Sequence, residues 1–216
     1  MATICTPVQR PGGERRGIVF VHGLGSDRRG YVEYGEQVAA GLGIWCLAVD
    51  LSGHGASTGD AGEISPAQHL RDVLAAWDEL TRRCRPDARR IGLCGSSYGA
   101  CLAALAVQHR RAARLLLRAP TIVTDEDLAR PLRLRSPDRD PVAASVLFGG
   151  LSRFRSPALV VECENDEVIP HALVGAYLAA LPTARHAVLT GAAHALTAPE
   201  WREDFARQML AFFADL

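Results

Sequence analysis

The chain has 216 residues, 48% of them hydrophobic, and equal numbers of acidic and basic residues, which suits one globular domain with a substantial core. The net charge of zero argues against a nucleic-acid-binding protein, because such proteins usually carry a basic excess. All 24 basic residues are arginine, so Schiff-base, Ser–Lys and phosphate-loop lysine chemistry is excluded.

Short apolar runs alternate with longer segments of helical periodicity. In chain order, the predicted strands are residues 17–21, 44–49, 90–94, 115–117 with their flanks, 158–163 and 186–189. The predicted helices are residues 32–40, 67–83, 100–108, 172–181 and 201–214. Most of the strands are apolar throughout, as in parallel sheets that are covered on both faces. The order predicts an α/β fold, with a mostly parallel sheet of about six to seven strands flanked by helices.

Three segments refine this pattern. Ser65 and Pro66 form a helix N-cap and a first-turn proline before the second helix. The arginine cluster at residues 82–90 suits a helix C-terminus, where the helix dipole favours cations. Residues 121–156 mix charges, prolines and glycines with little periodicity, which is typical of a functional or mobile segment. We therefore expect a single domain over residues 1–216, with a short cap-like insertion at about 121–156.

The pattern Gly-x-Ser-x-Gly, which surrounds many nucleophilic serines, occurs in GHGASTG (53–59) and again in CGSSYGA (94–100). Ser97 directly follows a predicted strand and precedes small helix-forming residues, as a sharp strand-to-helix turn requires. Ser57 lies in a loop rich in turn residues, and no helix follows it directly. The context selects Ser97 as the nucleophile and makes Ser96 a turn residue.

The turn around Ser97 explains its neighbours. Gly95 and Gly99 avoid collisions that bulkier residues would cause two positions on either side of the serine. The same turn aims the backbone N–H of Tyr98 at a developing oxyanion.

A serine hydroxyl is a weak nucleophile, so it needs a base and a group that orients the base. In a parallel sheet both should lie in loops after later strands. The segment ENDEVIP follows strand 158–163 and offers Glu164, Asp166 and Glu167, while His194 follows strand 186–189 and precedes the last helix. The order serine, acid, histidine is that of the α/β-hydrolase arrangement.

Two more segments carry a resemblance to a known family. FVHGLGS (20–26) matches a His-Gly loop after a strand, and VDLSGHGAST (49–58) matches an Asp-x-x-Gly-His-Gly-x-Ser segment. With CGSSYGA, they make the chain resemble the α/β-hydrolase superfamily over nearly its whole length. Within it, the chain is most similar to the branch of serine carboxylesterases, monoglyceride lipases and serine-aminopeptidase-like hydrolases. The pattern around Ser57 is then a by-product of the second segment running into Gly59.

The resemblance implies roles for individual residues. Ser97 is the nucleophile, Asp166 the acid and His194 the base. The backbone N–H groups of Leu24 and Tyr98 form the oxyanion hole. Three further residues are implied to be structural, namely His22, which braces the loop of Leu24, and Asp50 and His54. His22 is also a candidate for the pocket wall.

The chain departs from the family pattern at several places. Cys163 stands three residues before the acid, where the family usually has glycine, and Glu164 is the reserve candidate for the acid. The N-terminus has room for one strand, at residues 2–8, in place of the usual antiparallel pair. Glu162 lies within an apolar strand, where it either faces solvent at the strand end or lies near the pocket.

These residues imply a serine hydrolase that cleaves small carboxylic esters through an acyl-enzyme, with no metal and no organic cofactor. A thioesterase, an amidase or peptidase, or a perhydrolase uses the same triad, and a non-catalytic ligand-binding homologue is the alternative outside the enzymes. Apolar residues in 121–156 are few and scattered, so we expect a preference for short acyl chains of about two to six carbons. Phe148 is the candidate pocket residue, with core packing as its alternative role.

The sequence also predicts the cellular location and the partners of the protein. The six cysteines show no Cys-x-x-Cys pairing and no secretory signal is visible, which favours free thiols and a cytoplasmic location. Residues 91–109 are uncharged, but their Gly, Ser, Gln and His fit a buried strand, turn and helix better than a membrane span. The expected partner is a small-molecule ester, with no nucleic acid and no membrane.

Overall fold

The computed structural model describes residues 1–6, 15–85, 90–134 and 147–216. Its centre is a seven-stranded sheet in the order β1-β3-β2-β4-β5-β6-β7. The strands are β1 (Ala2–Cys5), β2 (Gly17–Val21), β3 (Trp45–Val49), β4 (Ile91–Ser96), β5 (Arg114–Arg118), β6 (Ala158–Cys163) and β7 (Ala184–Leu189). β1 pairs with β3 in antiparallel orientation, and the five other neighbouring pairs are parallel. The predicted mostly parallel α/β sheet is thereby confirmed, including one strand near the N-terminus.

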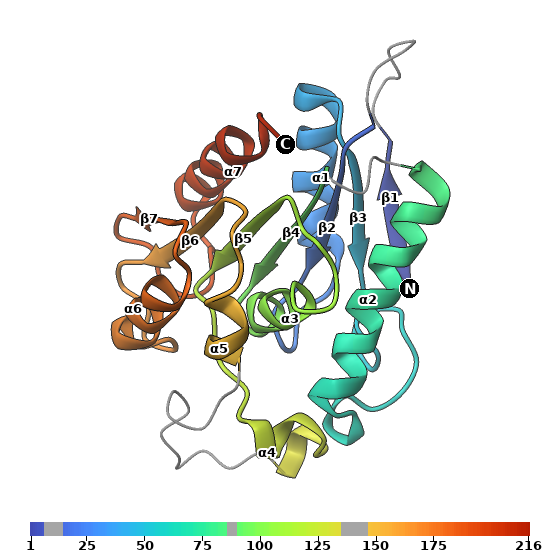
Figure 1. Ribbon diagram of the computed structural model, residues 1–216, viewed down its shortest axis with the longest axis vertical. Helices are drawn as coiled ribbons and strands as arrows, with labels where there is room; N and C mark the ends of the chain where they lie inside the picture. Colours follow the sequence, from blue (N-terminus) through green and yellow to red (C-terminus); the bar gives the residue numbers. More distant parts are fainter. Residues whose placement is uncertain (7–14, 86–89, 135–146) are drawn as a thin grey trace.

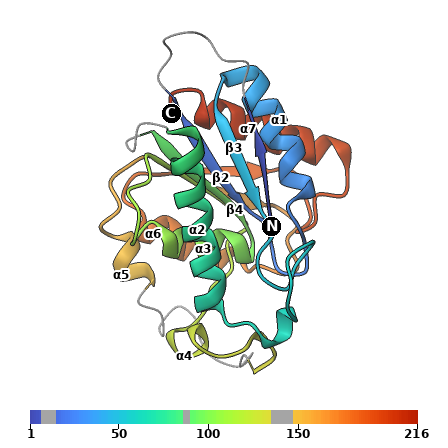
Figure 2. The ribbon, with the colours of Figure 1, turned by 90° about the vertical axis from the view of Figure 1, so that its right-hand side faces the viewer.

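Helices cover both faces of the sheet (Figure 1). The long helices are α1 (Arg29–Leu42), α2 (Pro66–Cys84), α3 (Tyr98–Ala106), α6 (His171–Ala180) and α7 (Pro199–Phe213). α1 and α7 contact each other on one face, while α2 packs on α3 and α5 packs on α3 and α6. Figure 2 shows α1 and α7 on one side of the sheet and α3, α5 and α6 on the other. The three-layer arrangement buries both faces of the central strands, which is why their sequences are apolar throughout.

The second helix begins as its sequence predicts. The Ser65 side chain accepts a hydrogen bond from the backbone N–H of Gln68, and Pro66 occupies the first turn. Arg82 and Arg83 lie in the last turn of α2, where both bind the Glu79 carboxylate. The helix thus has a side-chain cap at its start and cations at its end. Residues 86–89 of the arginine cluster lie outside the described residues.

Residues 121–156, where we expect an insertion, contain three short elements in their described part, α4 (Asp125–Leu128), η2 (Leu132–Leu134) and α5 (Leu147–Leu151). Arg133 of η2 forms an ion pair with Glu63, which belongs to η1 (Ala61–Glu63), at 2.5 Å. Leu147 and Leu151 of α5 are fully buried. The described parts of the insertion are therefore anchored to the main body at both ends.

The state of the cysteines and the character of the helices bear on two further expectations. All six cysteines are free and buried, as expected for small core residues. No helix in the described ranges combines the length and apolar character that a bilayer crossing demands.

Candidate active site

Ser97 occupies a one-residue turn between β4 and α3. Its backbone has φ of +53° and ψ of −119°, a conformation that L-residues rarely adopt. A Cβ on Gly95 would lie 2.3 Å from the carbonyl oxygen of Gly99, and a Cβ on Gly99 would lie 2.3 Å from that of Val21. Only glycine fits both places, so the strained turn at Ser97 depends on its two glycine neighbours.

The side chains of Ser97, His194 and Asp166 form one hydrogen-bonded chain. His194 Nε2 lies 3.1 Å from Ser97 Oγ, and His194 Nδ1 lies 2.8 Å from Asp166 Oδ2. Because a carboxylate only accepts, Nδ1 carries the ring hydrogen and Nε2 offers its lone pair to the serine hydroxyl. The Asp166 side chain is 3% exposed and that of His194 is 22% exposed, so the base faces the open side of the site.

The two candidates for the acid, both in the loop after β6, have different hydrogen-bond partners. Asp166 Oδ1 accepts hydrogen bonds from the backbone N–H groups of Val168 and Ile169, at 2.9 and 2.8 Å, which leaves Oδ2 directed at His194. Glu164 instead accepts a hydrogen bond from the backbone N–H of Gly191 at 2.7 Å. Glu164 thus ties the acid loop to the histidine loop, while Asp166 contacts the imidazole.

The loop after β2 lies directly against the serine. A Cβ on Gly23 would be 3.4 Å from Ser97 Cβ, and the next residue, Leu24, is 49% exposed. Tyr98 is the first residue of α3, and first-turn amides point toward the N-terminal end of their helix. Leu24, in the loop after β2, and Tyr98, at the start of α3, therefore belong to two different segments that adjoin Ser97.

The side chain of Tyr98 is anchored under the site. Its hydroxyl lies 2.9 Å from Nδ1 of the buried His69, whose Nε2 donates to the carbonyl oxygen of Ser52 at 2.9 Å. Burial lowers the pKa of His69, which keeps the ring neutral and able to accept from the tyrosine. Sequence reasoning missed His69, because a lone histidine in a helix gives no signal of its partner.

The expectation that His22 lines the pocket is wrong. The His22 side chain is 1% exposed, and its ring nitrogens bind the carbonyl oxygen of Gly23 and the backbone N–H of Leu51. The ring also packs against that of His54 at 5.2 Å. Its contacts are those of a brace beneath the loop of Leu24, which is the other role that the sequence suggested.

Asp50 and Ser57 belong to one structural cluster. The buried Asp50 carboxylate accepts hydrogen bonds from the backbone N–H groups of Arg28 and Ala56 and forms an ion pair with the Arg28 guanidinium. Ser57 Oγ donates to the carbonyl oxygen of Asp50 at 2.9 Å. The second Gly-x-Ser-x-Gly pattern therefore marks a loop that is fastened to the end of β3.

The prediction that Ser96 is a turn residue is wrong. Ser96 is the last residue of β4 and is 5% exposed. Its hydroxyl lies 2.5 Å from the Tyr31 hydroxyl and accepts a hydrogen bond from Arg118 Nε at 2.8 Å. The turn is one residue tighter than expected, because α3 begins directly after Ser97. Arg118 is a second residue that sequence reasoning missed, and its only signal is a charge at the end of the apolar strand LLLRAP.

Two further predicted residues have contacts of their own. Phe148 packs edge-on against Tyr177, with ring centroids 5.2 Å apart, which is the packing role left open for it. Glu162 is half-buried and binds His171 and His186 on neighbouring elements. Glu162 therefore links β6 to β7 and α6.

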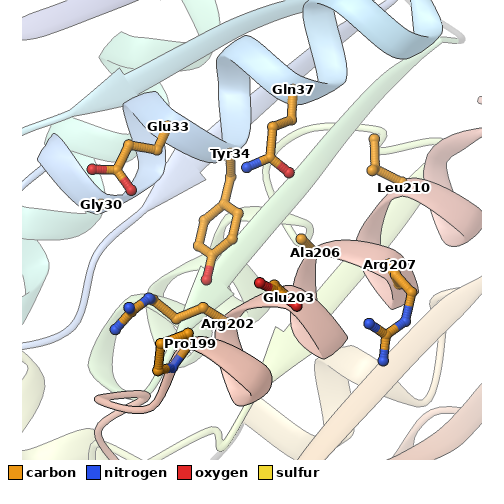
Figure 3. Close-up of a pocket in the computed structure, with 10 residues that line it drawn as sticks. All are labelled: Gly30, Glu33, Tyr34, Gln37, Pro199, Arg202, Glu203, Ala206, Arg207 and Leu210. Atoms are coloured by element: carbon orange, nitrogen blue, oxygen red, sulfur yellow. The ribbon is translucent and has the colours of Figure 1, made fainter.

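A cavity of about 480 Å³ opens beside the Leu24 turn. Its wall includes Leu24, His54, Leu132 and Arg133 together with several glycines. The cavity shares the loop of Leu24 with the site, but Ser97, Asp166 and His194 are not among its lining residues. A second cavity, of about 520 Å³, lies between α1 and α7 (Figure 3).

Comparison with known proteins gives the family. Residues 13–147, more than half of the chain, match the model of the serine aminopeptidase family, S33. The chain belongs to the S33 serine aminopeptidase family. The match includes Ser97 and ends before Asp166 and His194. The comparison with curated proteins found no match.

Solved structures share the fold of this S33 chain. A monoacylglycerol lipase from Paleococcus ferrophilus superposes with a TM-score of 0.76 at 18% identity, covering 100% of this chain and 98% of that one. Est1E from Butyrivibrio proteoclasticus, with ferulic acid bound, gives 0.77 at 19% identity and covers 99% and 95%. The acylaminoacyl peptidase from Pyrococcus horikoshii gives 0.75 at 18% identity, covering 98% of this chain and 39% of that one. The α/β-hydrolase fold is thereby shown, and the family membership supports a serine hydrolase.

Proposed function

We propose that this S33 protein is a serine hydrolase that cleaves small carboxylic esters through an acyl-enzyme intermediate. The observation that carries the proposal is the hydrogen-bonded chain Ser97–His194–Asp166, set at a strained turn at the carboxyl edge of the sheet. Ligands of open α/β folds bind at this edge. The positions of the three side chains support a nucleophile, a base and an orienting acid in that order.

In the acylation step, Ser97 Oγ attacks the ester carbonyl carbon and His194 Nε2 takes the hydroxyl proton. Asp166 holds the Nδ1 hydrogen and stabilises the imidazolium that forms. The carbonyl oxygen becomes an oxyanion, which the backbone N–H groups of Leu24 and Tyr98 bind. Each such donor typically stabilises the transition state by about 3 kcal/mol. Collapse breaks the ester bond, and the imidazolium returns its proton to the departing alkoxide.

In the deacylation step, water replaces the alcohol. His194 Nε2 takes a proton from that water, and the resulting hydroxide attacks the acyl carbon on Ser97. The second tetrahedral intermediate collapses to a carboxylic acid, and the proton on His194 returns to Ser97 Oγ. The half-exposed position of Ser97 and the partly exposed imidazole give water access to the acyl-enzyme.

A second candidate is hydrolysis of an N-terminal amide bond, because the matched family is described as serine aminopeptidase. The same three side chains can cleave an amide if His194 protonates the departing amine. An aminopeptidase also needs a carboxylate near the cavity to bind the free α-amino group of its substrate. The ten residues that line the cavity beside Leu24 include an arginine and no acid, so this cavity supplies no such carboxylate.

The experiment compares an ester and a thioester that carry the same acyl group, and adds an aminopeptidase substrate for the second candidate. Purified protein is assayed with p-nitrophenyl acetate, the matching thioester and alanine p-nitroanilide, with the Ser97→Ala variant as background. We expect the highest kcat/KM with the oxygen ester, and a loss of turnover of several powers of ten in the variant. Higher kcat/KM for the anilide would make the protein an amidase. Equal, background-level rates for the two proteins on all three substrates would contradict a serine hydrolase.

A further inference from the structure

Arg118, the last residue of β5, contacts both loops that carry the nucleophile and the base. Its backbone carbonyl oxygen accepts a hydrogen bond from the N–H of Ser97 at 2.8 Å. Its side-chain Nε donates to Ser96 Oγ at 2.8 Å, and its Nη1 donates to the carbonyl oxygen of His194 at 2.8 Å. Arg118 therefore makes two hydrogen bonds to the Ser96–Ser97 segment and one to the loop that carries His194.

The guanidinium is held by dipoles and rings. Nη1 also lies 3.4 Å from Cys163 Sγ, at the end of the strand that leads to Asp166. The Cζ atom lies 5.9 Å from the centre of the Phe205 ring. Among the described residues, Arg118 forms no ion pair with a carboxylate. The side chain therefore binds uncharged acceptors, each of which must lie in line with an N–H group. Because the guanidinium is planar and rigid, it fixes the positions of these acceptors relative to one another.

Helices α1 and α7 close the outer side of the guanidinium. The Tyr34 ring of α1 packs edge-on against Phe205 of α7 at 5.3 Å. Figure 3 shows Tyr34 reaching from α1 toward α7 across the cavity between them. Burial raises the pKa of Tyr34, and the positive charge of Arg118 opposes that rise, which indicates how near the guanidinium lies. The aromatic pair therefore lies against one side of the Arg118 guanidinium.

The backbone around Arg118 is also constrained. Ala119 has a φ of +43°, and its N–H donates to the carbonyl oxygen of Val161 on β6 at 2.8 Å. Two residues later, the N–H of Thr121 donates to the carbonyl oxygen of Ser97 at 3.3 Å. The backbone that follows Arg118 is thus hydrogen-bonded to β6 and to Ser97, which fixes the position from which the side chain reaches His194.

We propose that Arg118 is a positioning residue that sets the distance between His194 and Ser97. This inference rests on the proposed function. His194 lies in the loop after β7, an edge strand, and its backbone needs a fixed point if Nε2 is to stay within hydrogen-bond distance of Ser97 Oγ. Arg118 supplies that point by joining the His194 carbonyl to the strand that ends in Ser96. It touches neither substrate nor reacting atoms, and a misplacement of about 1 Å at such a site can lower the rate about 100-fold.

The test replaces Arg118 with Met, which keeps much of the apolar stem and removes every donor. We expect kcat on p-nitrophenyl acetate to fall about 10- to 100-fold, with KM within about threefold of the wild-type value. The rate of Ser97 labelling by a fluorophosphonate should fall by a similar factor, because it needs the same serine–histidine distance. Both measurements are made at least 20 °C below the Tm of each variant, so that only folded protein is compared.

The matched control is Arg114→Met. Arg114 lies at the other end of the same strand, its Cζ is 5.2 Å from the Phe212 ring centre, and its nearest carboxylate is that of Asp215 at 3.8 Å. It resembles Arg118 in strand, charge and ring contact but lies away from the site. We expect its kcat and labelling rate to stay within about twofold of wild type.

Two weaker variants keep the test decisive if Arg118→Met does not fold. Ser96→Ala removes one of the two oxygen anchors of the guanidinium, and Arg118→Lys keeps the charge without the planar fork. Each should lower kcat by a smaller factor than Arg118→Met, with KM little changed. Wild-type kcat and labelling rate in both of these folded variants, or in Arg118→Met itself, would overturn the positioning role. An unlabelled wild-type Ser97 would instead contradict the proposed function, so the two failures are distinguishable.

Discussion

The Asp166 carboxylate has each oxygen assigned by a hydrogen bond. Oδ1 accepts from two backbone N–H groups and Oδ2 faces His194 Nδ1 at 2.8 Å. An amide in its place can present an N–H to the ring, which favours the wrong imidazole tautomer. We predict that Asp166→Asn lowers kcat by about 10⁴-fold, measured with p-nitrophenyl acetate under saturating substrate.

Glu164→Gln is the matched comparison for that substitution. Its carboxylate binds the Gly191 N–H at 2.7 Å, and the amide oxygen of glutamine can accept the same hydrogen bond. We expect kcat within a few-fold of wild type. Collapse of activity in Glu164→Gln, with near-normal activity in Asp166→Asn, would move the role of the acid to Glu164.

The β4–α3 turn has no room for a side chain at Gly95. Placing a Cβ on Gly95 brings it to 2.3 Å from a backbone oxygen, and no flexible side chain can move to relieve that contact. We predict that Gly95→Ala lowers the free energy of unfolding by about 3 kcal/mol or more, measured by urea denaturation.

The control for the turn is Gly175→Ala in α6. An added Cβ there meets nothing within 4 Å, and the position is exposed. Alanine is the better helix former, so this variant should be more stable than wild type by about 1 kcal/mol. A Gly95→Ala protein as stable as wild type would mean that the turn is looser than the backbone contacts indicate.

The His171–Glu162 link between α6 and β6 should make the stability of the protein depend on pH. The hydrogen bond from His171 to the Glu162 carboxylate raises the pKa of that histidine above its ordinary value near 6.5. The folded state therefore binds the proton more tightly than the unfolded state. Its contribution to stability is fully present below about pH 6.5 and is lost as the pH rises through the raised pKa.

The measurement is the Tm of wild type and of His171→Gln at pH 6 and at pH 9. We expect the substitution to lower Tm more at pH 6 than at pH 9. In a Glu162→Gln background the same substitution should lose this pH dependence, because the partner that raises the pKa is gone. A larger effect at pH 9 than at pH 6 in the wild-type background would have the wrong sign for this link.

For the whole molecule, the small size of the insertion at 121–156 determines the acyl specificity that we propose. Its described elements are short, and η2 is pinned to η1 by the Arg133–Glu63 pair. The cavity beside Leu24 is about 480 Å³, near the lower end of the range for ligand pockets. A long apolar channel would add about 0.8 kcal/mol of binding for each buried methylene.

We therefore predict that kcat/KM is highest for acyl chains of about two to six carbons. The measurement is a series of p-nitrophenyl esters from acetate to palmitate, kept below the concentrations at which the longer esters aggregate. A steady rise from butyrate to palmitate would contradict the prediction and indicate a longer buried channel.

Much of the fold could be predicted because buried parallel strands are continuous apolar runs. The predicted strand 158–163 coincides with β6, and most other boundaries differ by one or two residues. β7 begins two residues early because it is an edge strand with several exposed residues, so apolar content marks its start poorly. The order of Ser97, Asp166 and His194 along the chain could be read because parallel strands bring their carboxyl ends to one edge.

The contacts of individual side chains could not be predicted in the same way. The choice between Asp166 and Glu164 depends on the path of a short loop, since both follow β6 within three residues. The partners of Ser96, His69 and Arg118 lie on other elements far along the chain, so no periodicity reports them. Loop position alone suggests His22 for the pocket wall, whereas its ring is buried beneath the loop.

The most direct test of the central claim is the site of covalent labelling by a fluorophosphonate. Because the chain has no lysine, trypsin cleaves only after arginine and places Ser97 in residues 91–110 and Ser57 in residues 30–71. We predict one adduct, on Ser97, in wild type and in Ser57→Ala, and none in Ser97→Ala. An adduct on Ser57, or ester turnover by a folded Ser97→Ala protein at the wild-type rate, would contradict the account.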